Sequence, residues 1–283
     1  MLNFCNRQAG LCGGLLLLVL ALNAACSGEI TATVKGPPVT PPAVEQGAPV
    51  YTYEIVNVFP HDPGAWTQGL DIEDGILFEG TGIYGRSSIR RVDLATGRVL
   101  QVCNLSPQYY GEGITVYKDS IIQLTLESGK GFVYDKNSLA LIREFPYSTQ
   151  GWGVTHDGDH IIMSDGTSVL QLLDPGTFER VGQIDVHDVN GPVERINELE
   201  YFDGRIYANI WQTDNIAIID PQDGRVTGWI DLSGLLGTRD DARPADVLNG
   251  IAWDAGTGHL YVTGKLWPYL FEIKPVDKLT SGR

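Results

Sequence analysis

The pattern that decides the fold is clearest in the segment Tyr109-Tyr110-Gly111-Glu112-Gly113-Ile114-Thr115. It places one carboxylate between two glycines, directly before an apolar run that predicts a β-strand. A buried Glu112 at this point would be suited to proton transfer, whereas a solvated Glu112 would be an ordinary turn residue. Taken alone, the segment does not decide between these two interpretations.

The same local pattern occurs five times along the chain. A polar or aromatic residue is followed by Gly or Glu and then by an aliphatic residue that opens a strand, in Gln68-Gly69-Leu70, Glu112-Gly113-Ile114, Trp152-Gly153-Val154, Asn197-Glu198-Leu199 and Asn249-Gly250-Ile251. The starting residues lie 44, 40, 45 and 52 positions apart. A period near forty residues, with several short β-patterned runs in each unit, is typical of a β-propeller.

Each of the first four units predicts four short strands, which is the content of one propeller blade. In the first unit these strands are residues 70–72, 76–79, 88–93 and 98–102. An aspartate ends the third strand of each unit before a tight turn, at Asp93, Asp135, Asp174 and Asp220. Aspartate in such a turn accepts hydrogen bonds from the backbone just after it, so these four residues are expected to be structural.

The fifth unit offers only three strands, at residues 251–253, 260–264 and 269–273. Residues 51–59 alternate as a strand does and belong to no unit of their own, so they can supply the missing strand. This pairing would join the two ends of the fold and cover an exposed sheet edge. We therefore expect an all-β, five-bladed β-propeller whose fifth blade is closed by an N-terminal strand, with loop insertions at residues 189–195 and 233–247, the latter with a short helix.

The N-terminal region predicts export. Arg7, an apolar run at residues 15–21 and the small residues before Cys26 indicate a signal peptide over residues 1–25. Cys26 stands where a bacterial lipoprotein carries its lipid, although Asn23 replaces the usual Leu, so plain secretion is an alternative. Residues 26–50 hold five of the fifteen prolines without hydrophobic periodicity and predict a disordered tether to the envelope. The propeller domain is then residues 51–283.

The composition narrows the range of partners. The chain has 35 acidic against 20 basic residues, a net charge of −15, which argues against a nucleic-acid partner. We expect contact with a membrane only through a lipid on Cys26, and we expect a monomer. Three ligand-binding motifs are rejected from their context: a strand pattern follows Gly80–Gly85 instead of a helix, His156 and His160 flank a hairpin turn, and residues 71–75 are too short for an EF-hand loop.

The candidate site lies where the five inner strands begin. In a propeller the first strand of each blade lines the central channel, so Gln68, Glu112, Trp152, Asn197 and Asn249 should meet at one rim. The second strands should end near the same rim, at Glu79, Leu126, Trp211 and Lys265, and Trp66 and Trp267 also fall at strand ends. Aromatic side chains together with one acid, one lysine and several amides favour an apolar pocket with a few placed polar groups.

These segments resemble the glutaminyl-peptide cyclotransferases of the plant and bacterial type, which are five-bladed propellers. The similarity runs from about residue 53 to residue 274 and rests on nine motifs in order. They are Thr67-Gln68-Gly69-Leu70, Gly82-Ile83-Tyr84-Gly85-Arg86-Ser87-Ser88, Gly111-Glu112-Gly113, Gly131-Phe132-Val133-Tyr134, Gly151-Trp152-Gly153, Ile196-Asn197-Glu198-Leu199-Glu200, Trp211-Gln212-Thr213-Asp214, Leu248-Asn249-Gly250-Ile251 and Thr263-Gly264-Lys265-Leu266-Trp267. The implied reaction converts an N-terminal glutamine of a peptide or protein to pyroglutamate with release of ammonia.

The resemblance also implies roles for residues. Glu112 matches the family's general acid/base, and the substrate pocket of the family is matched by Gln68, Trp152, Asn197, Trp211 and Lys265. We assign Lys265, with Gln68 or Asn197, to the oxyanion, and we add Trp66 and Asn249 to the substrate-binding set. Two positions depart from the family, which has Phe at Trp66 and Trp at Leu126. The family needs no metal or cofactor for its chemistry, and some members hold a structural calcium in the channel.

Two other functions remain open at this point. A non-catalytic propeller that binds a partner through its rim would explain the aromatic residues and the tether equally well, because a fold does not by itself imply an enzyme. A propeller hydrolase of the lactonase kind would need a channel metal with several carboxylate ligands. Incubation of a Gln-initiated peptide with and without a chelator distinguishes the three.

Overall fold

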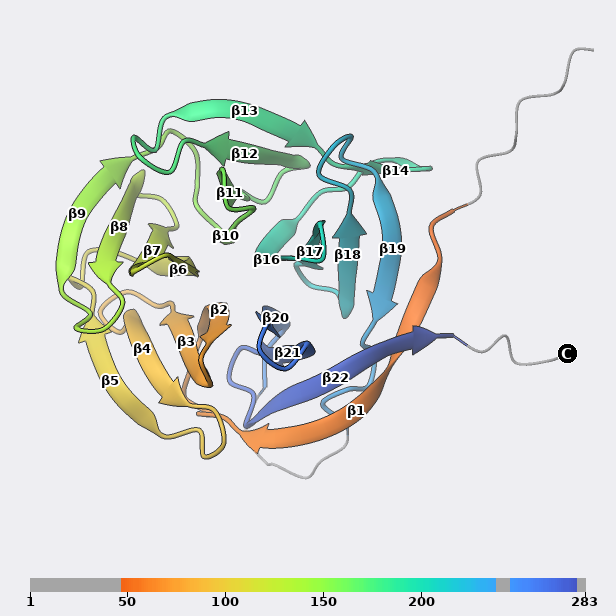
Figure 1. The fold of residues 1–283 in the computed structure, drawn as a ribbon, viewed down its shortest axis with the longest axis horizontal. Helices are drawn as coiled ribbons and strands as arrows, with labels where there is room; N and C mark the ends of the chain where they lie inside the picture. Colours follow the sequence, from red (N-terminus) through yellow and green to blue (C-terminus); the bar gives the residue numbers. More distant parts are fainter. Residues whose placement is uncertain (1–46, 238–244, 279–283) are drawn as a thin grey trace, which may run out of the picture. The chain divides into compact units, whose positions relative to one another are not determined.

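The computed structural model describes residues 47–237 and 245–278. In this part of the chain all regular structure is β, and no helix is present that could cross a lipid bilayer. Short antiparallel sheets stand in a ring, each with one edge toward the centre (Figure 1). The all-β propeller expected from the sequence is thereby confirmed.

Three consecutive units are separate four-stranded sheets with strands in chain order. The first contains β2 (Thr67–Glu73), β3 (Ile76–Thr81), β4 (Ser88–Asp93) and β5 (Val99–Asn104). The second contains β6 (Gly111–Tyr117), β7 (Ser120–Thr125), β8 (Lys130–Asp135) and β9 (Leu141–Pro146). The third contains β10 (Val154–His156), β11 (Ile161–Met163), β12 (Val169–Leu173) and β13 (Arg180–Asp185).

The remaining strands form one eight-stranded sheet, which consists of two four-stranded units joined by the N-terminal strand. The fourth unit contains β16 (Ile196–Phe202), β17 (Arg205–Ile210), β18 (Asn215–Ile219) and β19 (Val226–Asp231). The fifth contains β20 (Leu248–Asp254), β21 (His259–Gly264), β22 (Tyr269–Asp277) and β1 (Val50–Pro60).

The strand β1 closes the ring as the sequence predicts. It pairs antiparallel with β22 from Tyr51, opposite Asp277, to Pro60, opposite Tyr269. At its start it also pairs parallel with β19, with Val50 opposite Trp229. The first strand of the fold is thus the outer strand of the last unit, and it links that unit to its neighbour.

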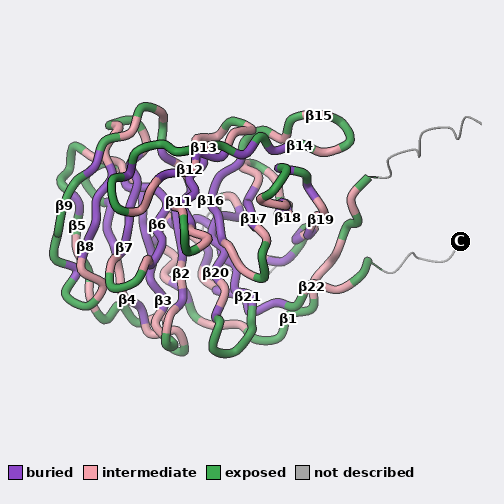
Figure 2. The backbone as a smooth tube through the Cα atoms, turned by 45° about the horizontal axis from the view of Figure 1, so that its top comes forward, coloured by how far each residue is buried: buried purple, intermediate pink, exposed green. Residues whose placement is uncertain are grey.

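Burial falls from the centre of the ring to its circumference (Figure 2). Six of the seven residues of the inner strand β6 are buried, whereas five of the six residues of the outer strand β9 are exposed. Inner strands have neighbours on both faces and at the centre, while outer strands border on solvent. A side chain placed at the start of an inner strand is therefore in the least solvated part of the fold.

The core is divided into five apolar clusters, each built mainly from two neighbouring units. The adjacent residues Ile121 and Ile122 of β7 illustrate the rule: Ile121 packs in a cluster with Phe78 of β3, and Ile122 in a cluster with Val154 of β10. Successive residues of a strand point to opposite faces, so both faces of a unit are buried. One cluster combines residues of β2 to β4 with residues of β20 to β22 and joins the last unit to the first.

The aspartate turns are confirmed as structural. The side-chain oxygens of Asp93, Asp135 and Asp174 accept the backbone N–H three residues on, at 3.0, 2.7 and 2.8 Å. In the fourth unit Asp220 accepts the N–H of Gln222 at 3.0 Å. These bonds fix the hairpins between third and fourth strands, far from the central rim.

The two expected insertions have different outcomes. Residues 189–195 overlap a small hairpin of β14 (His187–Asp188) and β15 (Gly191–Pro192). The helix expected within residues 233–247 is not found in the described parts, 233–237 and 245–247, which contain turns and irregular backbone. Residues 1–46, including the expected signal peptide, Cys26 and most of the tether, lie outside the described residues.

Removal of residues 50–60 should destabilise the whole domain, because β22 loses its partner and the link to β19 disappears. We expect a thermal midpoint at least about 10 °C lower, since each kcal/mol shifts the midpoint by roughly 2–4 °C in a domain of this size. A chain that begins at residue 47 is the matched control and should unfold at the wild-type temperature. Equal midpoints for the two truncated chains would rule out the closing role of β1.

Candidate active site

A break in strand register places the site residues of four of the five inner strands. The pairing of β2 with β3 is interrupted between Thr67 and Gly69, and that of β6 with β7 between Gly111 and Ile114. The same irregularity occurs in β16 and β20, across Asn197 and Asn249. Such bulges turn a side chain out of the regular alternation of a strand. In four units the repeated motif is therefore a bulge at the central rim, whereas in the third unit Trp152 stands just before β10.

The glycine of the motif allows neighbouring units to approach closely. A Cβ atom on Gly113 would lie 2.6 Å from the carbonyl oxygen of Trp152, to which the Gly113 N–H donates a hydrogen bond of 2.7 Å. A Cβ atom on Gly153 would lie 2.1 Å from the carbonyl oxygen of Asn197. A larger residue at either position would separate adjacent inner strands and displace the site residues beside it.

Glu198 replaces glycine in the fourth unit, and its side chain reaches two other units. One carboxylate oxygen accepts the Leu70 N–H at 3.2 Å and the other accepts the Ile251 N–H at 2.8 Å. This carboxyl is buried, and burial raises its pKa well above the ordinary value. Its role in the structure is to connect the first, fourth and fifth inner strands at the channel.

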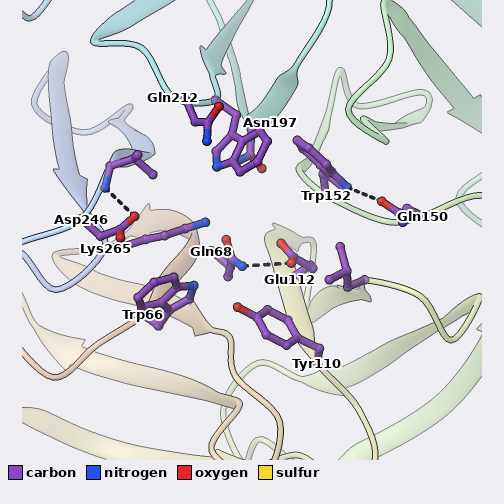
Figure 3. Close-up of a pocket in the computed structure, with 13 residues that line it drawn as sticks. Trp66, Gln68, Tyr110, Glu112, Gln150, Trp152, Asn197, Gln212, Asp246 and Lys265 are labelled. Atoms are coloured by element: carbon purple, nitrogen blue, oxygen red, sulfur yellow. Dashed lines mark hydrogen bonds between the residues drawn. The ribbon is translucent and has the colours of Figure 1, made fainter.

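The rim residues surround a pocket of about 520 Å³. Its lining residues are Trp66, Gln68, Tyr110, Glu112, Leu126, Gln150, Trp152, Asn197, Trp211, Gln212, Asp246, Val247 and Lys265. Figure 3 shows Glu112, Gln68 and Lys265 directed into one cavity, with aromatic rings around them. The structure thus brings together residues from all five units.

Glu112 is the buried acid of this pocket, with an exposed fraction of 4 %. Its Oε1 accepts a hydrogen bond of 2.9 Å from Nε2 of Gln68 (Figure 3). No described residue donates to its Oε2, so that oxygen is available to a bound molecule. Burial raises the pKa of Glu112 well above its usual range, and the charge of Lys265 partly opposes the shift.

Lys265 is the basic group of the pocket, with an exposed fraction of 6 %. Its Nζ lies 5.6 Å from the ring centre of Trp66, within cation–π range. No described residue accepts a hydrogen bond from Nζ or forms an ion pair with it within 4.0 Å. Burial lowers the pKa of Lys265, while the carboxylates of Glu112 and Asp246 act in the opposite direction.

Two indoles form the wall opposite Trp66. Trp152 and Trp211 meet edge to face, with ring centres 5.6 Å apart and planes at 83°. The Trp152 Nε1 donates to Oε1 of Gln150 at 3.0 Å, which fixes the orientation of that ring (Figure 3). The two rings and the Trp66 ring give the cavity an apolar interior around its few polar groups.

The amide of Asn197 is placed differently from that of Asn249. Asn197 lines the pocket, and its buried Oδ1 has no hydrogen-bond partner among the described residues. Asn249 was expected in the substrate-binding set, but it does not line the pocket. Its Nδ2 donates to the Thr67 carbonyl at 3.0 Å and to Oε1 of Gln68 at 3.3 Å, so it supports Gln68 from behind.

Two further residues that the sequence placed near the rim, Trp267 and Glu79, lie outside the pocket, and so does Glu200 of the fourth unit. Trp267 is in an apolar cluster, and its Nε1 donates to the Asp246 carbonyl at 2.8 Å. Glu79 is buried beside His61, and Glu200 accepts the Trp253 N–H at 2.9 Å. Each is held by contacts of its own and does not line the cavity.

The structural calcium that the resemblance implies for some members stays a prediction for this chain, and the channel acids have other contacts. Its acids, Asp71, Glu198 and Glu200, accept hydrogen bonds from backbone N–H groups of neighbouring units. Among the described residues, no three His, Cys, Asp or Glu side chains are arranged to hold a metal ion. The carboxylates of this region therefore act as links between strands.

Five pocket residues were not predicted: Tyr110, Gln150, Gln212, Asp246 and Val247. Burial raises the pKa of the Tyr110 hydroxyl to about 12, and the nearby Glu112 acts in the same direction, so this group is neutral at physiological pH. The only signal for Tyr110 and Gln150 was their position two residues before Glu112 and Trp152. Nothing in the sequence indicated Asp246 or Val247, which lie in an insertion.

Three comparisons with known proteins agree. The model of the family described as glutamine cyclotransferase matches residues 21–275. The chain is 44 % identical over 227 residues to a glutaminyl-peptide cyclotransferase of Arabidopsis thaliana, and the alignment covers 78 % of this chain and 70 % of the relative. It is similar in structure to the glutaminyl cyclase of Myxococcus xanthus, with a TM-score of 0.75 and 34 % identity over 81 % of this chain and 99 % of that one. The chain belongs to the glutamine cyclotransferase family.

Proposed function

We propose that this protein is a glutaminyl-peptide cyclotransferase that converts the N-terminal glutamine of a peptide or protein to pyroglutamate and releases ammonia. Family membership and the name of the Arabidopsis relative support the reaction. The observation that carries the assignment of the site is a buried carboxyl, Glu112, in a pocket lined by indoles, with one oxygen to which no described residue donates. A non-catalytic binding module is not favoured, because the family is named for an enzyme.

The substrate supplies both reacting groups. Its α-amine attacks the carbonyl carbon of its own side-chain amide, so the enzyme has mainly to hold the side chain folded back on the amine. The walls formed by Trp66, Trp152 and Trp211 suit this task, since flat aromatic surfaces restrict the rotamers of a short chain. The unpartnered Oδ1 of Asn197 is suited to accept a hydrogen bond from the substrate.

Glu112 moves one proton from the attacking nitrogen to the leaving nitrogen. The new C–N bond forms as Oε2 takes a proton from the amine, and the bond to the amide nitrogen breaks as Glu112 returns a proton, so that ammonia departs. The raised pKa allows the carboxyl to hold the proton between the two steps. Gln68 fixes the carboxyl by its bond to Oε1.

Lys265 stabilises the negative oxygen of the tetrahedral intermediate. Its ammonium group has no hydrogen-bond partner among the described residues and lies in a low-dielectric pocket, where such stabilisation is largest. Asn197 is the second candidate donor, through its amide nitrogen. Gln68 is less suited than the sequence suggested, because its amide already donates to Glu112.

The reaction itself is tested with a Gln-initiated peptide followed by mass spectrometry, with and without a chelator. We expect loss of one ammonia at the same rate in both samples. A chelator-sensitive reaction would favour the metal-dependent hydrolase alternative. If no Gln-initiated peptide reacts, the binding-module alternative replaces the proposed function.

Glu112→Gln should lower kcat by at least about 10²-fold and leave KM nearly unchanged, because it keeps the shape and the bond from Gln68 but removes the proton acceptor. Steady-state kinetics and a thermal melt measure the effect and check the fold. Glu200→Gln is the matched control: Glu200 is also a buried acid with a raised pKa, but it lies outside the pocket. If Glu112→Gln keeps most of the turnover, the acid/base assignment is wrong, and Glu79 and Glu200 become the carboxylates to test.

Leu126→Trp should lower KM several-fold with little change in kcat. Leu126 lines the pocket, and an indole there would restore the wall that the family resemblance implies and would cover more of the substrate. Leu126→Ala is the opposite control and should raise KM. A change confined to kcat in either variant would contradict a role of this position in substrate binding.

We also propose that the protein is exported and tethered to a bacterial envelope membrane through Cys26. The consecutive signal peptide, cysteine and proline-rich spacer of the sequence support this proposal. Cys26→Ser should move the protein from the membrane fraction to the soluble fraction, as measured by fractionation and immunoblot. If the wild-type protein is already soluble and unlipidated, the lipid anchor is wrong and plain export is the better interpretation.

A further inference from the structure

A second ionisable cluster lies beside the pocket, where the chain leads from β1 into β2. His61 is at its centre, and its side chain is only 2 % exposed. The Nε2 atom lies 3.0 Å from Oε1 of Glu79, whose side chain is 1 % exposed. The Nδ1 atom lies 2.7 Å from the carbonyl oxygen of Trp267. Neither residue lines the pocket, and the proposed reaction uses neither.

The two contacts of the His61 ring fix its protonation state. A backbone carbonyl only accepts hydrogen bonds, so Nδ1 must carry a hydrogen. Glu79 Oε1 already accepts a bond of 2.8 Å from the Thr67 hydroxyl, and Arg90 lies 3.6 Å from Oε2, which keeps this carboxyl ionised. The Nε2 atom must therefore also donate. With both ring nitrogens as donors, His61 is an imidazolium.

The charges that face His61 are few. Glu79 on β3 is its direct partner, and Asp62 is next to it in the chain. Arg90 on β4 lies between Asp62, at 2.8 Å, and Glu79. Lys265 is the charged residue of the turn that His61 contacts, and its side chain is directed into the pocket. The cluster thus contains two carboxylates, one guanidinium and the imidazolium, beside the pocket lysine.

The cluster connects two pieces of the pocket that are far apart in sequence. The first piece, residues 61–67, contains Trp66 and runs directly into Gln68. The second is residues 264–268, the turn that carries Lys265. His61 contacts this turn twice, through Nδ1 and through its N–H, which donates to the Pro268 carbonyl at 2.9 Å. The Leu266 N–H donates to the Ala65 carbonyl at 2.8 Å. Trp267 extends the connection, since its indole holds the Asp246 carbonyl at the rim of the pocket.

We propose that protonated His61, clamped between Glu79 and the Trp267 carbonyl, is a positioning residue that holds the Lys265 turn against the Trp66 segment and thereby makes substrate binding dependent on pH. This inference rests on the proposed function, because it concerns the same pocket. His61 touches neither the substrate nor the reacting atoms. Its second proton lets the ring donate to Glu79 and to the Trp267 carbonyl at once, and loss of that proton leaves one ring nitrogen facing an acceptor without a hydrogen, which weakens the clamp between Glu79 and the turn.

The direction of the pH effect follows from the environment of the pair. Burial lowers the pKa of His61, but the charge and hydrogen bond of Glu79 outweigh it, so the pKa is raised above its ordinary value. The stabilisation of the turn is therefore complete below the ordinary histidine pKa and is lost as pH rises through the raised value. The pKa of Glu79 is lowered by His61 and Arg90 against the effect of burial, so the pair persists until the pH falls through that lowered value. Substrate affinity should decline on the alkaline side of this window.

The first test observes the proton directly and does not depend on activity. Nitrogen-15 NMR of the histidine-labelled protein, with the His61 signals identified by their loss in His61→Gln, should show two protonated ring nitrogens at pH 7. It should also show titration to a single proton only above the ordinary histidine pKa. A neutral His61 ring at pH 7 would overturn the proposal, whatever the enzyme does to peptides.

The second test separates positioning from a general structural role. In Glu79→Gln the imidazolium loses its counter-charge, so the pH at which KM begins to rise should move at least about one unit lower. This shift corresponds to a tenfold change in the acid dissociation constant of His61. The kcat at saturating Gln-initiated peptide should change less than about threefold. Glu272→Gln is the matched control, because Glu272 is a buried acid in another His–Glu pair, with His259 at 2.6 Å, and lies outside the pocket.

The outcomes separate the two proposals. If the wild type does not cyclise any Gln-initiated peptide, the proposed function fails, and the NMR result still decides the state of His61. Suppose that the wild type is active. If Glu79→Gln does not change the pH at which KM begins to rise, or shifts it no more than Glu272→Gln does, the positioning role is wrong. If Glu79→Gln does not fold, the test compares two pH values of the wild type: the pH at which KM rises and the pH at which His61 titrates in the NMR experiment. A difference of more than about one pH unit overturns the proposal.

Discussion

The structure depends on the closure of a ring whose core is divided among the interfaces between its units. Each apolar cluster is built mainly from two neighbouring four-stranded units, and the cluster between the last and first units exists only if the chain ends meet. The antiparallel pairing of β1 with β22 makes that junction, and the short parallel pairing of β1 with β19 reinforces it. A sheet buried on both faces has no stable isolated form, so the units must assemble together.

The site is a consequence of how the closed ring packs at its centre. Five inner strands meet at the channel, and a register break or strand start at the same position in each of them turns one side chain toward the rim. Glycine at the next position lets adjacent strands approach, and in the fourth unit Glu198 takes its place and bonds to two neighbouring strands. The pocket therefore needs no separate element to hold it, because its residues are fixed by the same contacts that close the channel.

Two buried glutamates show how environment assigns different roles to one side chain. Glu112 has one hydrogen bond from a neutral amide, and burial raises its pKa despite the nearby Lys265, which suits a group that exchanges protons. Glu79 is equally buried, but His61, Arg90 and Thr67 all favour its ionised form, so its pKa is lowered. In the proposed function the first carboxyl exchanges protons, whereas the second forms an ion pair, and the difference lies in their partners and not in burial.

The sequence by itself determined the architecture and most of the pocket. A closed propeller is predicted by a repeat near forty residues, by four β-patterned runs in each of the first four units and by a spare N-terminal strand. These signals are readable because strand alternation and turn chemistry are local properties of the chain. Equivalent positions of a repeat occupy equivalent places in the ring, so Gln68, Glu112, Trp152 and Asn197 could be expected to converge. Only the tertiary structure decided that Asn249 and Trp267 lie behind the pocket, and that Asp246 and Val247 line it. It also decided that His61 contacts the Trp267 carbonyl, 206 residues away, and that Asn249 contacts the Thr67 carbonyl, 182 residues away. His61 and Glu79 are only 18 residues apart, but they pair because of the direction of their side chains. Contacts between distant segments and the direction of a side chain have no periodic signal in the sequence.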